Sequence, residues 1–254
     1  MKELIYKVVD FFTFGKGLKK TFFGYPVRLP TRYINYFPSD YEQDNFNFLI
    51  KSVPQNGAVL DIGAHIGLFS MVAAQLTGKQ GKVFSFEPTT ATRQLLEQTI
   101  RINNMAGTVV PCQQAVSNKE GSIVFYESDV VGDNSNSLVE YLEDRGLKGT
   151  TVPVTTVDIF VQQQGLQRVD FIKIDVEGAE YDAIRGAAET LKNFRPFCIL
   201  AIHPTPIAKK GDRLEDIYDF VVNAGYKVTL AQKPLSREDF CNNKEMIDLH
   251  LYPA

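Results

Sequence analysis

Three acidic side chains and one histidine lie where apolar segments of the chain end. Asp61, Glu87, Asp175 and His203 each close or directly follow a short apolar segment that is typical of a β-strand. Helix-like segments separate these strands, so we expect a parallel sheet, and the carboxyl ends of its strands share one edge. Carboxylates and imidazole accept protons and bind amino groups or hydroxyls. The four side chains are therefore predicted to meet at one site.

The alternation of short apolar and longer amphipathic segments predicts an α/β fold with a doubly wound, mainly parallel sheet. The predicted strands are 58–62, 82–86, 108–112, 169–174, 197–202, 226–230 and 247–251. The predicted helices are 67–76, 90–103, 179–191, 212–223 and one that starts near Ser39 and ends before Pro54.

A glycine turn joins the first strand to the next helix. Gly63 and Gly67 enclose Ala64 and His65 in this turn. Glycine allows a sharp turn and a close approach of the backbone to a ligand, and the helix that starts there offers unpaired N–H groups. Glu87, at the end of the second strand, is placed to accept both hydroxyls of a ribose. Together these features predict a nucleoside cofactor.

The turn does not have the pattern of a dinucleotide site. It contains no GxG, and Asp61 places negative charge where a pyrophosphate would lie. S-adenosylmethionine has no phosphate and carries a sulfonium cation and an amino group, so it suits the site better. A nicotinamide-dependent oxidoreductase remains the alternative, and a non-catalytic nucleoside-binding protein of the same fold is a third interpretation.

Three motifs together resemble the FkbM-type methyltransferase family, and the resemblance runs from about Tyr41 to about Pro204. The motifs are 61–67, 86–88 and 172–180. The resemblance implies a Rossmann-like class I methyltransferase fold. It also implies S-adenosylmethionine-dependent transfer of a methyl group to a hydroxyl of a sugar, glycolipid or natural product.

The resemblance also assigns residues to the cofactor. Asp61, Gly63 and Gly67 are expected at its methionine end, Glu87 at its ribose, and Gln114 and Ala115 beside its adenine. Ala64, His65 and Pro88 complete the predicted cofactor-binding set. Two positions depart from the family pattern: His65 replaces an Asn, and Ala201 stands where many members carry Glu.

The predicted chemistry is direct displacement at the methyl carbon, with His203, Asp175 and Glu177 as catalytic residues. His203 has an ordinary pKa near neutrality, which suits a general base. Asp175 could instead be the base, orient His203, or contact the amino group of the cofactor. The three side chains could also bind a metal ion, but their spacing is not diagnostic, and we predict no required metal.

Composition narrows the setting. The chain has 254 residues and a net charge of −3, without the basic excess of nucleic-acid-binding proteins. Its three cysteines form no disulfide or metal pattern, and no apolar run is long enough for a membrane span. We expect a cytoplasmic enzyme that acts on a small molecule or carbohydrate. The sequence does not predict its oligomeric state.

Residues 1–40 are predicted to be a helical N-terminal extension, and residues 41–254 the methyltransferase domain. Residues 1–25 combine a helical apolar face with five lysines, so peripheral contact with a membrane or partner is possible. Packing of this helix over the core or the substrate site is the favoured interpretation. Residues 117–157 are predicted to be a β-rich insertion on the substrate side, with an ordinary surface hairpin as the alternative.

Overall fold

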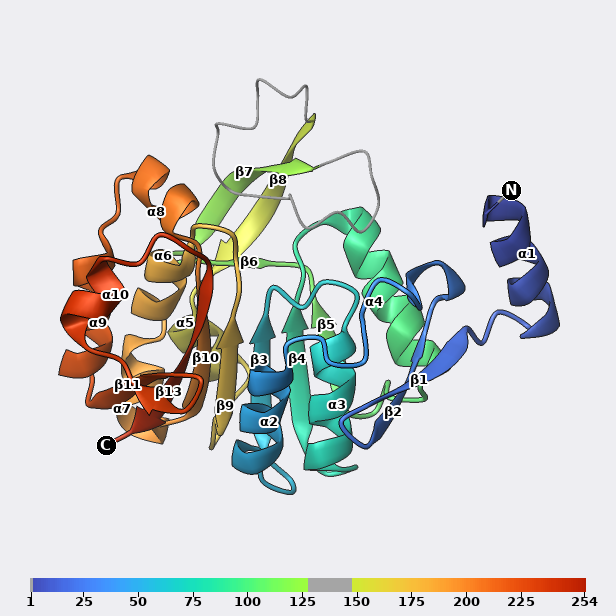
Figure 1. The fold of residues 1–254 in the computed structure, drawn as a ribbon, viewed down its shortest axis with the longest axis horizontal. Helices are drawn as coiled ribbons and strands as arrows, with labels where there is room; N and C mark the ends of the chain where they lie inside the picture. The colour runs from blue at the N-terminus through green and yellow to red at the C-terminus, as the bar shows by residue number, and fades with distance from the viewer. Residues whose placement is uncertain (1, 128–147) are drawn as a thin grey trace.

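The computed structural model describes residues 2–127 and 148–254 (Figure 1). The polar stretch 129–137, which the sequence places in the substrate-side insertion, lies outside the described residues.

The described part of the chain forms a central sheet with the strand order β12-β11-β13-β10-β9-β3-β4-β5. The neighbouring strands β5, β4, β3, β9 and β10 are parallel. Beyond β10, the pairs β10–β13, β13–β11 and β11–β12 are antiparallel. The chain winds outward from β3 through β4 to β5 and then returns to β9 on the other side of β3. This reversal is where open α/β sheets bind ligands. The strands are β3 (Ala58–Ile62), β4 (Lys82–Phe86), β5 (Val109–Cys112), β9 (Phe171–Ile174), β10 (Phe197–Ile202), β11 (Tyr226–Leu230), β12 (Lys233–Pro234) and β13 (Ile247–Pro253).

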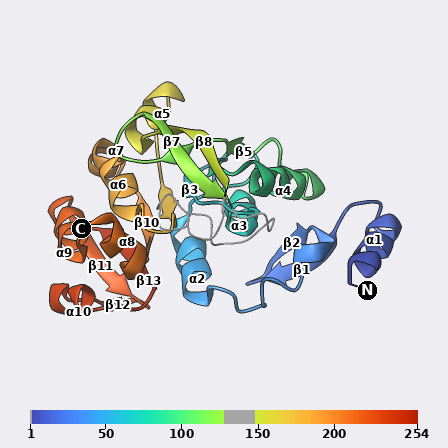
Figure 2. The same ribbon diagram turned by 90° about the horizontal axis from the view of Figure 1, so that it is seen from above.

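Helices cover both faces of this sheet, which confirms the predicted doubly wound α/β fold (Figure 2). One face packs against α2 (Gln43–Ser52), α3 (Leu68–Thr77) and α4 (Thr90–Ile102). The other packs against α5 (Val157–Gln163), α6 (Glu180–Arg185), α7 (Ala188–Phe194), α9 (Leu214–Asn223) and α10 (Arg237–Cys241). The short helix α8 (Pro204–Lys210) follows β10. No helix in the described ranges combines the length and the apolar character that a membrane crossing requires.

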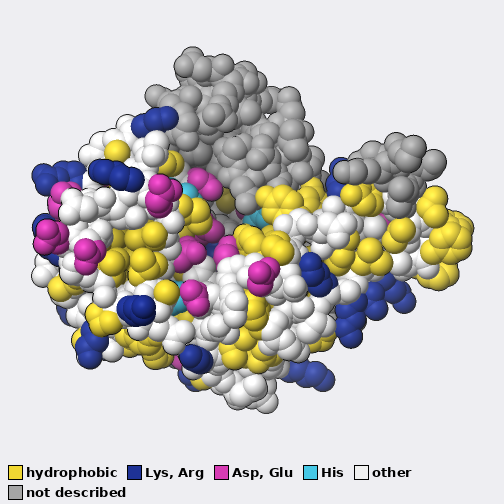
Figure 3. Space-filling view, in the orientation of Figure 1, with side chains coloured by type: hydrophobic (Ala, Val, Ile, Leu, Met, Phe, Trp, Pro, Cys, Tyr) yellow, Lys and Arg dark blue, Asp and Glu magenta, His cyan; other side chains and the backbone are white. Residues whose placement is uncertain are grey.

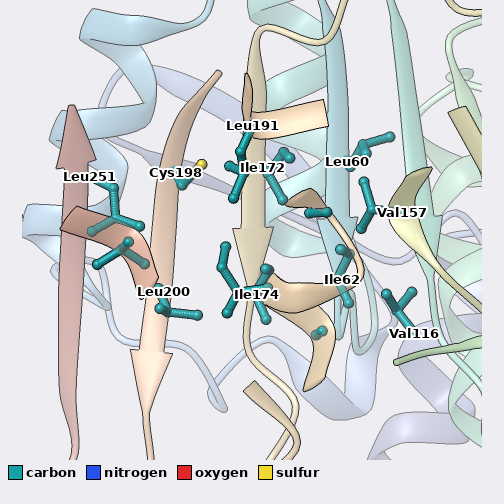
Figure 4. Close-up of a cluster of buried hydrophobic side chains, with 14 of the residues drawn as sticks. Leu60, Ile62, Val116, Val157, Ile172, Ile174, Leu191, Cys198, Leu200 and Leu251 are labelled. Carbon is teal, nitrogen blue, oxygen red and sulfur yellow. The ribbon is translucent and has the colours of Figure 1, made fainter. Parts of the chain in front are cut away.

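Alternation along the central strands decides which face each side chain joins. Leu60, Ile62, Ile172 and Ile174 enter the core under α5, α6 and α7 (Figure 4). Their neighbours in sequence, such as Val59 and Phe171, enter the core under α2 and α3. Successive strand residues point to opposite faces, so Asp61 and Lys173 project toward α3. Two charged residues are thereby buried between the sheet and α3.

One predicted helix, 179–191, is two helices in the structure. It breaks between α6 and α7 at Gly186, where a Cβ would lie 2.1 Å from the carbonyl oxygen of Ser117. The loop after β6 lies so close to Gly186 that only glycine fits there. The sequence pattern around this position predicted a continuous helix. The pattern also missed the short elements α5, α8, α10 and β12.

The N-terminal segment contributes to the core. It forms α1 (Lys2–Phe12), the hairpin β1 (Leu18–Phe22) and β2 (Tyr25–Leu29), and a 3₁₀ turn η1 (Thr31–Tyr33). Phe22, Val27 and Leu29 are buried in the core shared with α3 and α4. The boundary at residue 40 stays a prediction, although residues of this hairpin pack as part of the domain.

The predicted strands of the 117–157 segment are present. The strands β6 (Ala115–Val116), β7 (Gly121–Glu127) and β8 (Lys148–Thr155) form a second sheet with the order β6-β8-β7. Its predicted role in selecting the acceptor stays a prediction.

Gly63 joins the ends of two central strands. Its φ is +82°, and a Cβ at this position would lie 1.9 Å from the carbonyl oxygen of Asp175. The turn after β3 therefore packs directly on the backbone after β9, at the point where the sheet changes direction. Only glycine fits, because both the dihedral angle and the space exclude a side chain.

We expect Gly63→Ala to destabilise the protein by about 2–5 kcal/mol, from left-handed backbone strain and overpacking together. The free energy of unfolding from urea denaturation measures this loss. Gly107→Ala is the matched control, since a Cβ there meets nothing within 4 Å, and its stability should be nearly unchanged. Equal stability of the two variants would contradict this account of the turn.

Candidate active site

A cavity opens at the carboxyl ends of β3, β4 and β9, with an empty volume of about 1030 Å³ including its open mouth. Four carboxylates line it, against one lysine, and acidic side chains gather near the middle of the face in Figure 3. Its apolar wall comes from the segment before and within α2, from α3, and from β4 and β6. The charged lining residues are Glu42, Glu87, Asp175, Glu177 and Lys173, and the aromatic ones are Phe37, Tyr41, Phe46, Phe69 and Phe86.

Most of the predicted cofactor-binding residues line this cavity. The lining includes Gly63, Ala64, His65, Glu87, Pro88, Gln114 and Ala115. Asp61 and Gly67 lie outside the lining set: Asp61 is fully buried, and Gly67 precedes α3 with a φ of +89°. A Cβ at Gly67 would lie 2.5 Å from a methyl carbon of Leu96, so this glycine serves the packing of α3 against α4.

The carboxylate of Glu87 binds the glycine turn. It accepts a hydrogen bond from the backbone N–H of His65 at 3.1 Å. It also accepts one from the N–H of Thr89 at 3.0 Å and one from the Thr89 hydroxyl. These donors fix the orientation of the carboxylate, and its side chain still forms part of the cavity wall.

A row of polar side chains crosses the sheet on the α3 face. Asp61 lies opposite Ser85 on β4 and Lys173 on β9 in the strand register. The Ser70 hydroxyl donates to Asp61 Oδ2 at 2.5 Å, and Lys173 Nζ donates to Asp175 Oδ2 at 3.0 Å. Lys173 is 6% exposed. A buried ammonium is therefore held between the carboxylates of Asp61 and Asp175.

The charged groups of this row shift one another's pKa values. Burial alone would lower the pKa of Lys173, but Asp175, Asp61 and Glu42 outweigh it and raise the pKa above its usual value. Burial raises the pKa of Asp61 despite Lys173 and Ser70. Burial would also raise the pKa of Asp175, but Lys173 and His203 together lower it. Lys173 stays charged, and Asp175 stays an anion at the cavity wall.

The three predicted catalytic residues come together beside this row. His203 Nε2 lies 3.8 Å from Asp175 Oδ1 and 3.6 Å from Glu177 Oε2. On the other side of the ring, Nδ1 lies 2.7 Å from Oε1 of Glu180, a fully buried carboxylate. Asp175 and Glu177 line the cavity, whereas His203 lies behind them. Their catalytic roles stay predictions.

These carboxylates change the protonation of His203. Burial would lower its pKa, but Glu180, Glu177 and Asp175 raise it to about 9. The near-neutral value on which its assignment as a base was built therefore does not hold in the structure. Burial, opposed by His203 and reinforced by Asp175, raises the pKa of Glu177 to about 7. At neutral pH the histidine is a cation, and Glu177 is the group poised to gain or lose a proton.

Asp175, Glu177 and His203 each offer one atom that could hold a metal ion, and these atoms lie within 4.8 Å of one another. A metal would require a neutral imidazole, whereas the surrounding carboxylates favour the imidazolium. The absence of a required metal stays a prediction.

Sequence reasoning missed Lys173 as a site residue, although a lysine inside an apolar strand is a usable signal.

Sequence reasoning also missed Asp248, which lies opposite Ala201 in the β10–β13 register. Asn45 donates to Asp248 Oδ2 at 2.9 Å and to Glu42 Oε2 at 3.1 Å. Burial and Glu42 raise the pKa of Asp248 to about 6. A neighbouring strand thus supplies a carboxylate near the position where the resemblance expects one.

We expect Lys173→Met to destabilise the protein by about 3–5 kcal/mol, because it leaves buried carboxylates without their cation. Arg237→Met is the matched control, since the Arg237–Asp219 pair is about half exposed on both sides, and such surface pairs contribute little to stability. Urea denaturation of both variants measures the difference. A Lys173→Met variant as stable as the Arg237→Met variant would show that the buried lysine is not needed to balance this site.

Comparison with known proteins agrees with this geometry. Residues 61–228 match the family model for the methyltransferase FkbM domain. The chain is 25% identical over 163 residues to the hexuronic acid methyltransferase AglP of Haloferax volcanii, covering 64% of this chain and 62% of AglP. It is 31% identical over 150 residues to the 2-O-methyltransferase NoeI of Sinorhizobium fredii, covering 54% of this chain and 60% of NoeI. The matches therefore span about three fifths of these curated relatives.

Among solved structures, the methyltransferase FkbM from Methylobacillus flagellatus superposes with a TM-score of 0.52 at 17% identity. The match covers 78% of this chain and 44% of that one, and it supports the Rossmann-like fold. The family model matches well over half of the chain, including the glycine turn and the Asp175 region. The chain therefore belongs to the FkbM methyltransferase family.

Proposed function

We propose that this protein transfers a methyl group from S-adenosylmethionine to a hydroxyl of a sugar-containing acceptor. The observation that carries the proposal is the acidic cavity at the sheet reversal, which combines the glycine turn, Glu87 and Asp175 in one lining. The names of AglP and NoeI, a hexuronic acid methyltransferase and a 2-O-methyltransferase, support a sugar hydroxyl as the acceptor.

The residues present fit this cofactor. S-adenosylmethionine supplies a methyl group activated by a sulfonium cation. Glu87 would accept the ribose hydroxyls, with Gln114 and Ala115 beside the adenine, and the Gly63 turn would follow the methionine end. Glu42 and Asp175 offer negative charge to the amino group. The same charges would repel the pyrophosphate of a dinucleotide, so the oxidoreductase alternative has less support.

Glu177 is our candidate for the proton acceptor. It lines the cavity, has a pKa of about 7, and is held by a backbone with a φ of +49° at the start of the turn into α6. His203 would act as a positioning residue, since its imidazolium faces Glu177 and Asp175 while Glu180 fixes the ring. Asp175 would keep the lysine and histidine charges in place and border the methyl group. Alignment of acceptor and methyl donor supplies the rest of the rate enhancement.

Aromatic side chains just before α2 would form part of the acceptor wall. Phe37 and Tyr41 line the cavity, and Tyr36, which is 43% exposed, lies 5.9 Å from His65 between ring centroids. Aromatic faces of this kind suit the apolar face of a sugar ring.

The free thiols of all three cysteines are consistent with the proposed cytoplasmic setting.

The protein should bind S-adenosylmethionine and S-adenosylhomocysteine in calorimetry, and NAD should not compete. Glu87→Gln should weaken this binding by about 10–100-fold, because it removes a charged acceptor. Glu97→Gln, on the following helix, is the control and should bind normally. Tight NAD binding without S-adenosylhomocysteine binding would instead favour the oxidoreductase, and cofactor binding without transfer to any hydroxyl would favour the non-catalytic interpretation.

The pH dependence of kcat/KM should identify the base. Glu177 accepts a proton only when ionised, so activity should fall as the pH drops through about 7. Glu177→Gln should lower kcat by about 10²–10⁴-fold, whereas Glu189→Gln, an exposed change on α7, should not. His203→Gln removes a cation that lowers the pKa of Glu177, so the profile should move to higher pH. A profile that instead rises near pH 9, the pKa of His203, would assign the base to the histidine.

A further inference from the structure

Helix α1 and the turn that follows it leave large apolar side chains on the surface. Phe11, Phe12 and Phe14 are 74%, 73% and 88% exposed. No described residue of α1 belongs to a buried core cluster, and Figures 1 and 2 show the helix at one end of the molecule beyond the β1–β2 hairpin. Within the described residues, α1 contacts the η1 turn, and its packing over the core or the substrate site stays a prediction.

Positive charge is concentrated around these phenylalanines. Residues 1–25 contain five lysines and two acidic residues, for a net charge of +3 within a chain of net charge −3, so the remainder carries −6. Lys7, Lys16 and Lys19 are exposed. Asp10 is exposed as well, and the Thr31 hydroxyl donates to its Oδ1 at 2.5 Å. Figure 3 shows the yellow side chains at this end of the molecule, with dark blue ones below them.

We propose that residues 6–19, the anchor segment, bind the surface of an anionic phospholipid bilayer. The phenylalanines would enter the interface between headgroups and acyl chains, and the lysines would meet the lipid phosphates. The combination of exposed phenylalanines and lysines matches an anionic lipid surface, which presents apolar and negative groups together. The segment is too short to cross the bilayer, so contact is peripheral and reversible.

The anchor segment is connected to the cavity. η1 follows the β1–β2 hairpin, Thr31 binds Asp10 of α1, and Phe37 a few residues later lines the cavity. A bound bilayer would therefore hold the active site close to acceptors carried on lipid, a consequence that depends on the proposed function. Bilayer binding itself does not depend on methyl transfer.

Co-sedimentation of the full chain with vesicles tests the proposal. The protein should bind vesicles of equal parts phosphatidylcholine and phosphatidylglycerol, and bind phosphatidylcholine alone much more weakly. The triple variant Phe11→Ser, Phe12→Ser, Phe14→Ser should lose at least about 100-fold in partitioning. Lys7→Gln, Lys16→Gln and Lys19→Gln together should lose about 100-fold on the anionic vesicles only. High salt should reproduce the lysine result, since it screens the lipid charge.

Val110→Ser, Val222→Ser and Met246→Ser together form the matched control, because these apolar side chains are exposed elsewhere, and this variant should bind like the wild type. Circular dichroism and cofactor binding confirm that each variant is folded. No binding to anionic vesicles would overturn the proposal, as would binding that the phenylalanine variant retains. Self-association that this variant abolishes, measured by sedimentation without vesicles, would identify a second copy as the occupant.

Discussion

The rest of the site depends on the buried ammonium of Lys173. It lies opposite Asp61 in the strand register and binds Asp175 at the end of its own strand. Removing three charges from water is costly unless they compensate one another. Lys173 and Asp175 compensate each other directly, and the Ser70 hydroxyl donates to Asp61. The result is a fixed negative group at the cavity wall beside His203. The ends of β3 and β9 are held together by this charge row on one side and by the Gly63 backbone contact on the other.

This arrangement leaves the cavity with an excess of negative charge. Lys173 balances the carboxylates behind the wall, but Glu42, Glu87, Asp175 and Glu177 remain on the lining. The sulfonium and amino group of the proposed cofactor would meet complementary charge there, whereas phosphates would not. The same crowding of carboxylates raises the pKa of His203 and, with burial, that of Glu177. One electrostatic environment therefore supports both the proposed cofactor and the proposed proton acceptor.

The sequence predicted the bounds of several central strands. The bounds of β3, β4, β10 and β11 agree with the expectation because each is a short run rich in apolar residues between turns or helices. Parallel topology alone predicted Asp61, Glu87, Asp175 and His203 at one edge of the sheet. Glu87 and Asp175 line the cavity there, whereas Asp61 and His203 are buried and lie outside its lining. The pKa of His203 could not be predicted, because it depends on Glu180 and Glu177, whose approach is a tertiary result. The break at Gly186 likewise depends on a contact with Ser117. The carboxylate of Asp248 belongs to β13, which is far from β10 in the sequence.

The most direct test of the central claim is a crystal structure of the protein with S-adenosylhomocysteine. We predict that both ribose hydroxyls lie within hydrogen-bond distance of the Glu87 carboxylate and that the sulfur faces Asp175 and Glu177. A ligand bound elsewhere, or one whose ribose does not contact Glu87, would contradict the assignment of this cavity to the cofactor.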